Sequence, residues 1–345
     1  MARQDTTHMT ELFKHVAVFT DIHFGLKHNS KRHNQDCLDF LTWFIEEAKT
    51  RGCETCIFSG DWNHHRASIN VSTLNYSMTA FSMLSKAFDN IYFIVGNHDL
   101  YYKEKREINS IPMAELYPNI HLIDEITEID DVAIVPWLVG DEWKKVAKIK
   151  SKYMFGHFEL PKFKMNAQVE MPDHGQLQAE DFQHQDYIFS GHFHKRQQKG
   201  IIHYIGNPFG HNYSDTWDFD RGAMFLKWGG KPEYVNWEHG PRYIALDLSK
   251  LLQDPDRYLN GQTYAKVELD VDISYEEANF LRETFFDHYD IRELKLLPKH
   301  ESEGSDELVG EIKFETVNQI VNDCIRTMDS QTYKIDTLTQ IFNDL

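Results

Sequence analysis

The chain has 345 residues, which is enough for one large domain and a smaller one. Hydrophobic residues make up 41% of the sequence, but no apolar run reaches the roughly 18 residues of a membrane helix, so no membrane partner is expected. Asp and Glu outnumber Lys and Arg by 54 to 36, which gives a net charge of −18. Proteins that hold DNA alone usually present a basic surface, so an acidic chain acting on DNA would rely on metal ions or on a partner.

Residues 1–15 are mostly polar and lack the apolar core of a secretion signal, so export is not expected. Cys53 and Cys56 form a C-x-x-C pattern, but no second pair completes a zinc site. We therefore expect buried, reduced thiols in a cytoplasm, either of a bacterium or of a phage-infected host cell.

Five short apolar runs, rich in β-branched and aromatic residues, predict buried strands. Side chains of metal-binding types follow these runs directly, in the segments Asp21-Ile22-His23, Gly60-Asp61, Gly96-Asn97-His98-Asp99, Gly156-His157 and Gly191-His192-Phe193-His194. Ligands of an open α/β sheet gather beyond the carboxyl ends of its strands. We therefore expect these side chains to meet in one crevice.

Apolar residues at helical spacing predict helices at Cys37–Ala48 and Leu74–Phe88. Each helix follows a ligand-bearing strand, which gives β-α-β units and favours a doubly wound α/β sheet. The first domain is expected to end near the turn Gly229–Pro232.

Beyond that turn, the pattern predicts a small α/β cap with strands at Tyr243–Leu248 and Tyr264–Val271, a helix at Tyr275–His288 and a strand at Arg292–Leu297. An acidic segment without large apolar residues follows and predicts a linker. From Phe314 onward, apolar residues again recur at helical spacing. The expected organisation is a catalytic domain at 1–230, a cap at 231–299, a linker at 300–307 and a helical tail at 308–345.

The predicted ligands include carboxylates, an amide and imidazoles, and they outnumber the four ligands of a closed zinc site. A paired site fits this set better, with one carboxylate shared by two ions about 3.5–4 Å apart. Asp61 stands alone on its turn and is the expected bridge. Imidazole suits zinc, iron and manganese, whereas carboxylate and amide oxygens suit harder ions such as manganese, so two Mn²⁺ are expected, with Mg²⁺ or another divalent metal as an alternative.

The order D-x-H, G-D, G-N-H-[DE], G-H and G-H-x-H over residues 16–194 resembles the calcineurin-like metallophosphoesterase superfamily. The resemblance implies an α/β fold with a β-sheet sandwich flanked by helices. It assigns Asp21, His23 and His194 to one ion and Asn97, His157 and His192 to the other, with Asp61 between them. It also implies that His98 protonates the leaving oxygen and that Asp99 orients His98, a role that suits imidazole near neutral pH.

Further segments resemble the SbcD-type nuclease subunits of double-strand-break repair complexes, above all the versions encoded by large phages. These are His64 three residues after Asp61, the strand Ile134–Trp137, the turn Tyr204–Pro208 and the acidic segment Asp220-Arg221-Gly222. The turn departs from the family pattern at Asn207, where serine is usual.

This narrower resemblance implies a Mn²⁺-dependent DNA exo/endonuclease that acts in repair or recombination and hydrolyses phosphodiesters with metal-activated water, with His64 at the scissile phosphate. It also implies an SbcC-like coiled-coil ABC-type ATPase as partner, bound through the C-terminal tail, and it leaves homodimerisation open.

Several alternatives remain at the level of sequence. The same site would serve a stand-alone metallophosphatase or a cyclic-nucleotide phosphodiesterase, and the chain could also be an inactive scaffold for an ATPase. The tail could fold back on the cap instead of docking on a partner. His203 and His211 flank the Tyr204–Pro208 turn and could support the metal ligands.

Overall fold

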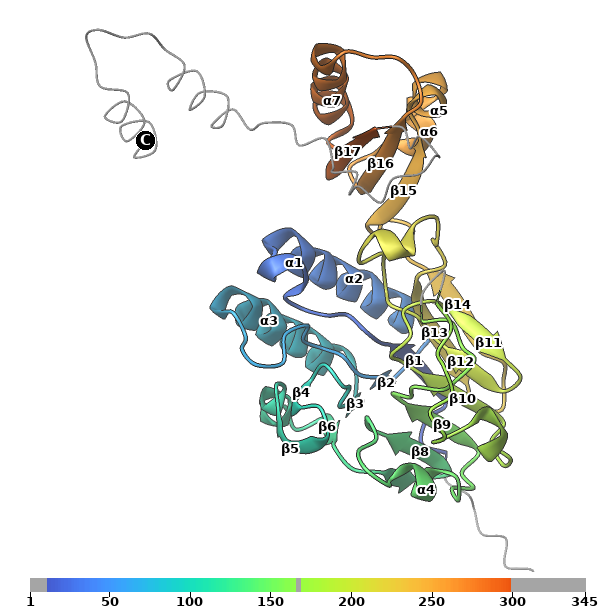
Figure 1. Ribbon diagram of the computed structural model, residues 1–345. Helices are drawn as coiled ribbons and strands as arrows, with labels where there is room; N and C mark the ends of the chain where they lie inside the picture. Colours follow the sequence, from blue (N-terminus) through green and yellow to red (C-terminus); the bar gives the residue numbers. More distant parts are fainter. Residues whose placement is uncertain (1–10, 166–168, 299–345) are drawn as a thin grey trace, which may run out of the picture. The chain divides into compact units, whose positions relative to one another are not determined.

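The computed structural model describes residues 11–165 and 169–298 (Figure 1). The chain divides into two compact units, Met1–Tyr243 and Ile244–Leu345. The expected linker at 300–307 and helical tail at 308–345 lie outside the described residues. None of the described helices combines the length and the apolar character that crossing a membrane would require.

The first unit contains two six-stranded sheets. The first sheet has the order β14 (Glu233–Asn236), β13 (Gly222–Lys227), β1 (His15–Phe19), β2 (Thr55–Phe58), β3 (Asn90–Ile94) and β6 (Ile120–Ile123). The last four of these strands run parallel to one another, whereas β13 is antiparallel to β1 and to β14. The turn at Gly229 thus joins two strands of one sheet, and the first unit continues beyond residue 230 to Tyr243.

The second sheet has the order β11 (Gln197–Lys199), β12 (Ile202–Tyr204), β10 (Tyr187–Ser190), β9 (Tyr153–Gly156), β8 (Val132–Val135) and β7 (Thr127–Ile129). Its four inner strands are parallel, and its two edge strands are antiparallel to their neighbours. A hairpin of β4 (Leu100–Tyr102) and β5 (Lys105–Asn109) follows the first ligand-bearing strands.

Helices α2 (Lys31–Thr50) and α3 (Val71–Ala87) confirm the two predicted helices and lie side by side along one face of the first sheet (Figure 1). Asn70 caps α3, because its side chain accepts a 2.9 Å hydrogen bond from the backbone N–H of Ser72. The remaining short helical segments of this unit are α1 (Leu26–Asn29), η1 (Pro112–Leu116), α4 (Trp143–Val146), η2 (Ala179–Asp181) and η3 (Tyr213–Asp215).

The first sheet is not doubly wound, because both long helices cover the same face and the second sheet covers the other. Alternate residues of a strand point to opposite faces, and in β1 both sets are apolar. Ala17 and Phe19 pack in the cluster that includes α2 and α3, whereas Val16 and Val18 pack against residues of the second sheet. The sandwich flanked by helices is thus confirmed.

The second unit is built on a three-stranded sheet of β15 (Arg242–Asp247), β16 (Thr263–Leu269) and β17 (Glu293–Pro298). It also contains α5 (Leu248–Gln253), α6 (Pro255–Tyr258) and α7 (Tyr275–Tyr289). Ser274 and Glu277 form a capping box that starts α7. The predicted cap elements are therefore present with boundaries within two residues of those expected.

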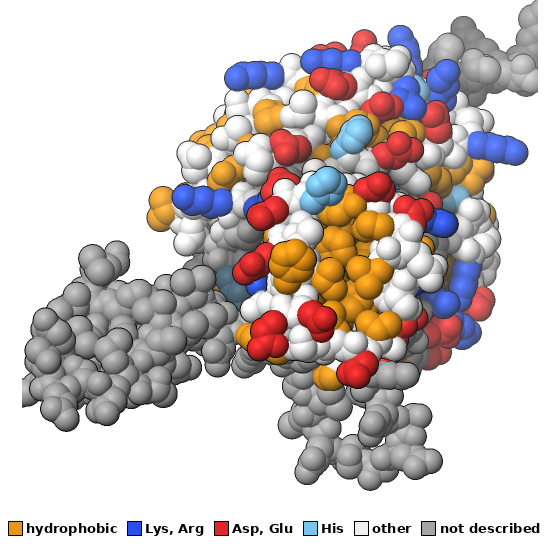
Figure 2. All heavy atoms as spheres, turned by 90° about the horizontal axis from the view of Figure 1, so that it is seen from above, with side chains coloured by type: hydrophobic (Ala, Val, Ile, Leu, Met, Phe, Trp, Pro, Cys, Tyr) orange, Lys and Arg blue, Asp and Glu red, His pale blue; other side chains and the backbone are white. Residues whose placement is uncertain are grey.

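One face of the molecule carries a contiguous apolar area bordered by acidic side chains (Figure 2). Within the second unit, the exposed apolar side chains include Phe280 on α7, which is 68% exposed, and Leu252 on α5. The acidic surroundings agree with the net charge of −18.

Candidate metal centre

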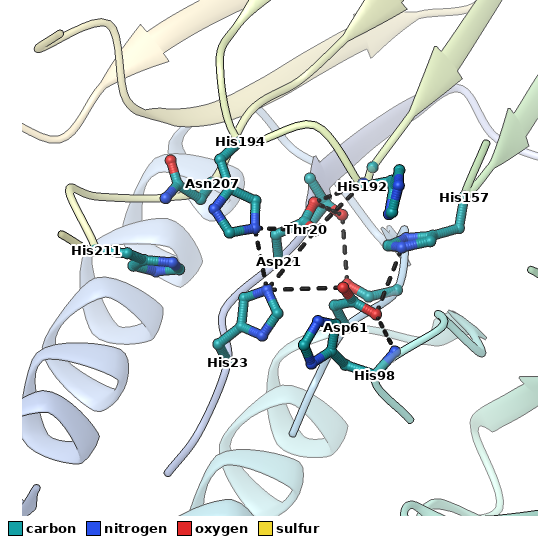
Figure 3. A network of polar contacts seen from close by, with 12 residues as sticks. Thr20, Asp21, His23, Asp61, His98, His157, His192, His194, Asn207 and His211 are labelled. Atoms are coloured by element: carbon teal, nitrogen blue, oxygen red, sulfur yellow. Dashed lines mark hydrogen bonds and ion pairs between the residues drawn. The ribbon is translucent and has the colours of Figure 1, made fainter. Parts of the chain in front are cut away.

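All seven predicted ligands meet at one edge of the sandwich, where parallel strands of both sheets end, and Figure 3 labels all of them except Asn97. β1 delivers Asp21 and His23, β2 delivers Asp61, β3 delivers Asn97, β9 delivers His157, and β10 delivers His192 and His194. Parallel neighbouring strands finish on the same side of a sheet, so the strand order alone brings residues far apart in sequence to one place.

The carboxylate of Asp61 lies between two groups of ligands. Its Oδ2 atom is 3.7 Å from Nε2 of His23. Its Oδ1 atom is 3.4 Å from Nε2 of His157. Because the two oxygens face different groups, this carboxylate has the geometry of a bridge between two cations.

The first group consists of Asp21, His23 and His194. The Nε2 atoms of the two histidines are 3.2 Å apart, and each is 3.9 Å from Oδ1 of Asp21. Thr20 fixes the carboxylate by donating a 2.6 Å hydrogen bond to Oδ2 of Asp21. Two imidazole nitrogens and two carboxylates, counting Asp61, thus point at one small volume.

The second group consists of Asn97, His157 and His192. The amide oxygen of Asn97 lies 2.9 Å from Nε2 of His157 and 3.0 Å from Nδ1 of His192. Nδ1 of His157 is 2.8 Å from the carbonyl of Ser59, which as acceptor places a proton on Nδ1 and leaves Nε2 facing the site. Nε2 of His192 lies 3.3 Å from Glu159, a carboxylate that sequence patterns did not single out because no motif contains it.

The electrostatics of the site call for cations. Burial raises the pKa of Asp21 to about 7, and the nearby Asp61 carboxylate adds to the rise. Burial also acts to raise the pKa of Asp61, but the charge and hydrogen bond of His157 together with the charges of His23 and His98 outweigh it and hold that pKa well below its usual value. Asp61 in turn raises the pKa of His157 to about 9 against the effect of burial, so without a metal ion Nε2 of His157 carries a proton that a bound cation would displace. Buried carboxylates among imidazole lone pairs are a donor set that fits two divalent ions.

Several ligands have strained backbones. Asp21, His23, Asp61 and His192 all have positive φ, between 52° and 85°, a region that costs non-glycine residues about 1–3 kcal/mol. Gly96 allows the strand ends to approach, because a Cβ at this position would collide with the side chain and backbone N of Asp61. Placing these ligands therefore costs local backbone stability.

The expected pair of catalytic histidines lies beside the first group. The rings of His64 and His98 stack with centroids 5.4 Å apart, and the ring of His98 is 4.8 Å from that of His23. The backbone N–H of His98 donates a 2.8 Å hydrogen bond to Oδ1 of Asp61. Nδ1 of His98 lies 2.9 Å from the carbonyl oxygen of His64, so the proton is on Nδ1 and Nε2 is left for a substrate.

Asp99 does not have the contact expected of it. Its buried carboxylate accepts hydrogen bonds from four backbone N–H groups, those of Asp61, Trp62, Asn63 and Gly96. The carbonyl of His64, not Asp99, holds the His98 ring. Asp99 instead fixes the turn that carries Asp61.

The turn that departs from the family pattern closes the other side of the site. Its residue Asn207 donates its backbone N–H to the carbonyl of His194 and accepts from the guanidinium of Arg221 with its side chain. Arg221 is 4% exposed and also donates to the carbonyl of His194 and to Asp215. Asn207 thus anchors His194 through the backbone.

The family model described as calcineurin-like phosphoesterase matches residues 14–196, more than half of the chain. Exonuclease subunit 1 of Enterobacteria phage T4 is 28% identical over 198 residues, which is 55% of this chain and 58% of that protein. The chain therefore matches less than two thirds of the length of this relative.

Two solved structures are similar at low identity. Nuclease MPE of Pseudomonas putida is 16% identical, with 62% of this chain and 84% of that chain covered and a TM-score of 0.31. A dimetal phosphatase from Danio rerio is 11% identical, with 62% and 92% covered and a TM-score of 0.37. The family match over residues 14–196 and the ligand geometry lead to one conclusion: this chain belongs to the calcineurin-like phosphoesterase family.

Proposed function

We propose that this chain is a two-metal DNA nuclease that uses Mn²⁺ and works as the nuclease subunit of an SbcCD-like complex. The observation that carries the proposal is the two-sided environment of Asp61, with His23 near one oxygen and His157 near the other. Two ions at such a bridge would polarise a phosphodiester and activate water for in-line attack.

Each side chain then has a defined task. Asp21, His23 and His194 would hold one ion, Asn97, His157 and His192 the other, and Asp61 would be shared. The expulsion of an alkoxide requires a proton, which the imidazolium form of His98 would supply from Nε2, the ring nitrogen that does not face the His64 carbonyl. His64 stacks on His98 and lies where a scissile phosphate could accept its N–H.

Manganese fits the ligand set better than the alternatives. The donors combine carboxylate and amide oxygens with imidazoles, whereas magnesium favours oxygen ligands and structural zinc sites have four. The proposal of DNA as substrate is supported by the T4 relative, which is named an exonuclease subunit.

The same relative supports a partner, since its name describes a subunit. We propose an SbcC-like ATPase that binds the tail at residues 308–345, with 300–307 as the linker and with a cap that begins after Tyr243 instead of at the expected residue 231. Such a partner would supply the DNA affinity that a chain with a net charge of −18 lacks.

An activity comparison tests the proposal. The full chain with Mn²⁺ should cleave linear duplex and single-stranded DNA faster than it hydrolyses nucleotide monoesters or cyclic nucleotides, and the SbcC-like ATPase should raise cleavage of long duplexes. Asp61→Asn, which keeps the size of the side chain, serves as the inactive control. Faster turnover of monoesters or cyclic nucleotides than of DNA would point instead to a stand-alone phosphatase or phosphodiesterase.

A further inference from the structure

His211 lies at the edge of the metal centre, in the loop between β12 and β13 (Figure 3). Its ring centroid is 5.5 Å from that of His23 and 5.3 Å from that of His194. One ligand atom from each of these three histidines can be chosen so that all lie within 4.8 Å of one another. His211 is part of none of the five metal-ligand motifs and none of the segments that resemble SbcD-type subunits.

The imidazole of His211 lacks the partners that a buried polar group requires. The residue is only 1% exposed, yet neither Nδ1 nor Nε2 has a hydrogen-bond partner. A buried donor or acceptor without a partner costs about 1–3 kcal/mol. The edge-on packing against Phe209 and neighbouring rings would be satisfied equally well by a phenyl ring, so packing does not account for the two nitrogens.

The backbone of His211 is fixed without any help from its side chain. Its N–H donates a 2.8 Å hydrogen bond to Asp215, and its carbonyl accepts a 2.9 Å hydrogen bond from the hydroxyl of Tyr243. Asp215 is itself held by Arg221 at 3.0 Å. The loop therefore presents a preorganised ring whose polar atoms have nothing to bind.

We propose that His211 is an additional ligand of the ion held by Asp21, His23 and His194. The inference rests on the metal centre of the proposed function and adds a residue to it. Neither ring nitrogen of His211 has a hydrogen-bond partner, so the nitrogen that carries no proton has its lone pair available to a cation.

A third imidazole would change the donor atoms, and with them the metal preference, of the site that contains Asp21, His23 and His194. The ion near His211 would have three nitrogen donors beside the carboxylates, whereas the ion near Asn97 would have two imidazoles and an amide oxygen. Because imidazole suits zinc and other borderline metals better than manganese or magnesium, the end with His211 should be the more zinc-selective of the two.

Calorimetric titration of the metal-free full chain with Zn²⁺ and, separately, Mn²⁺ tests the assignment. His211→Phe keeps an aromatic ring in the packing and removes both nitrogens. It should weaken Zn²⁺ binding at one of the two sites by at least about tenfold, with a smaller loss for Mn²⁺. His203→Phe is the matched control, because His203 is also buried and has an unpaired Nε2, but packs on Phe189 and Tyr234 away from the ligands.

A measurement on the unsubstituted chain makes the result independent of how well the variant folds. In the Co²⁺-loaded protein, nuclear magnetic resonance should show contact-shifted ring signals from His211 as well as from the histidine ligands. Unchanged Zn²⁺ affinity in a folded His211→Phe, or an unshifted His211 ring beside shifted His23 and His194 rings, would overturn the proposal while leaving the nuclease function intact. If instead the chain binds metals as expected but does not cleave DNA, the proposed nuclease function is overturned and the assignment of His211 as a ligand stands.

Discussion

The carboxylate of Asp99 accepts a 3.0 Å hydrogen bond from the backbone N–H of Asp61, the residue at the centre of the metal site. Each of its two oxygens accepts two backbone N–H groups. Burial and the nearby Asp61 raise the pKa of Asp99 to about 7, while the N–H donors act in the opposite direction. The turn that carries Asp61 is therefore held by a buried carboxylate whose hydrogen bonds depend on its staying ionised.

Asp99→Asn should destabilise the chain and weaken metal binding. The amide would direct its NH₂ group at two backbone donors, so two hydrogen bonds to a charged acceptor are lost, at a cost of about 3 kcal/mol in the free energy of unfolding. Chemical denaturation in metal-free buffer at pH 8 measures the stability, and calorimetry measures the affinity.

Asp131→Asn is the control for this substitution. Asp131 also accepts a backbone N–H, from Lys152 at 3.0 Å, but lies away from the ligands. It should lose less stability and no metal affinity. Equal metal affinity in Asp99→Asn and the unsubstituted chain would mean that the turn carrying Asp61 needs no such support.

The meeting of the seven proposed ligands could be predicted because each lies within four residues of the end of one of five strands. Asp21, Asn97 and His157 follow apolar runs, and parallel strand order then brings their side chains together. The chemistry of the site is thus encoded locally, and only the topology is needed to assemble it.

Other features depend on tertiary geometry that no local pattern contains. Asp99 follows His98 directly and so looks like its partner, but its side chain turns to the other side and binds the Asp61 turn. His211 lies in a loop without periodicity, and its position is set by Asp215 and Tyr243. The packing of two sheets was implied only by the family resemblance, because the apolar pattern of a strand such as β1 fits against helices or against another sheet.

Asp61→Ala should abolish the binding of both ions and the cleavage of DNA. Removing the carboxylate deprives the His23 side and the His157 side of their shared oxygen donors. Calorimetry with Mn²⁺ gives the number of ions bound per chain. Retention of two ions with unchanged affinity would show that another residue forms the bridge.

His98→Ala should separate chemistry from metal binding. The side chain of His98 bonds to the carbonyl of His64 and is not needed to complete either ligand group, so both ions should remain. Turnover of DNA should fall by about 10²–10⁴-fold, the usual effect of losing a general acid.

A p-nitrophenyl ester provides the control for His98, because its leaving group needs no proton. The loss on this substrate should be clearly smaller than on DNA. Equal losses on both substrates would assign His98 to binding or to site structure, and near-normal DNA cleavage would remove it from the mechanism.

Three cysteines should resist alkylation in the folded chain. Burial raises the pKa of Cys53 to about 12 and the pKa values of Cys37 and Cys56 further above their usual range. Because the thiolate is the reactive form, only about one Cys53 thiol in 10⁴ is reactive at pH 8. Peptide mass spectrometry after iodoacetamide treatment should find them labelled only after denaturation. Rapid labelling of Cys53 and Cys56, suppressed by Zn²⁺, would instead make the C-x-x-C pair a metal site.

Arg221→Lys should reduce both the stability of the chain and the affinity of the site that contains His194. The buried guanidinium binds Asp215, Asp218, Asn207 and the carbonyl of His194 at once, and the ammonium of lysine cannot reproduce this forked set. Leaving Asp215 buried without its partner should cost about 3 kcal/mol in the free energy of unfolding.

Arg51→Lys is the matched control for Arg221→Lys, because it alters a pair of ion pairs at the surface. Arg51 binds Glu47 and Glu233, and the side chain of Glu233 is 56% exposed, so this substitution should change stability by less than about 1 kcal/mol. Denaturation curves and Zn²⁺ titrations of both variants give the comparison.

Because Arg221 reaches the metal centre only through the His194 backbone and the Asn207 turn, its substitution should weaken the binding of one ion and leave the binding of the other unchanged. Equal weakening of both ions would mean that the loop acts on the whole site, and no weakening would mean that the His194 backbone holds its place without the guanidinium.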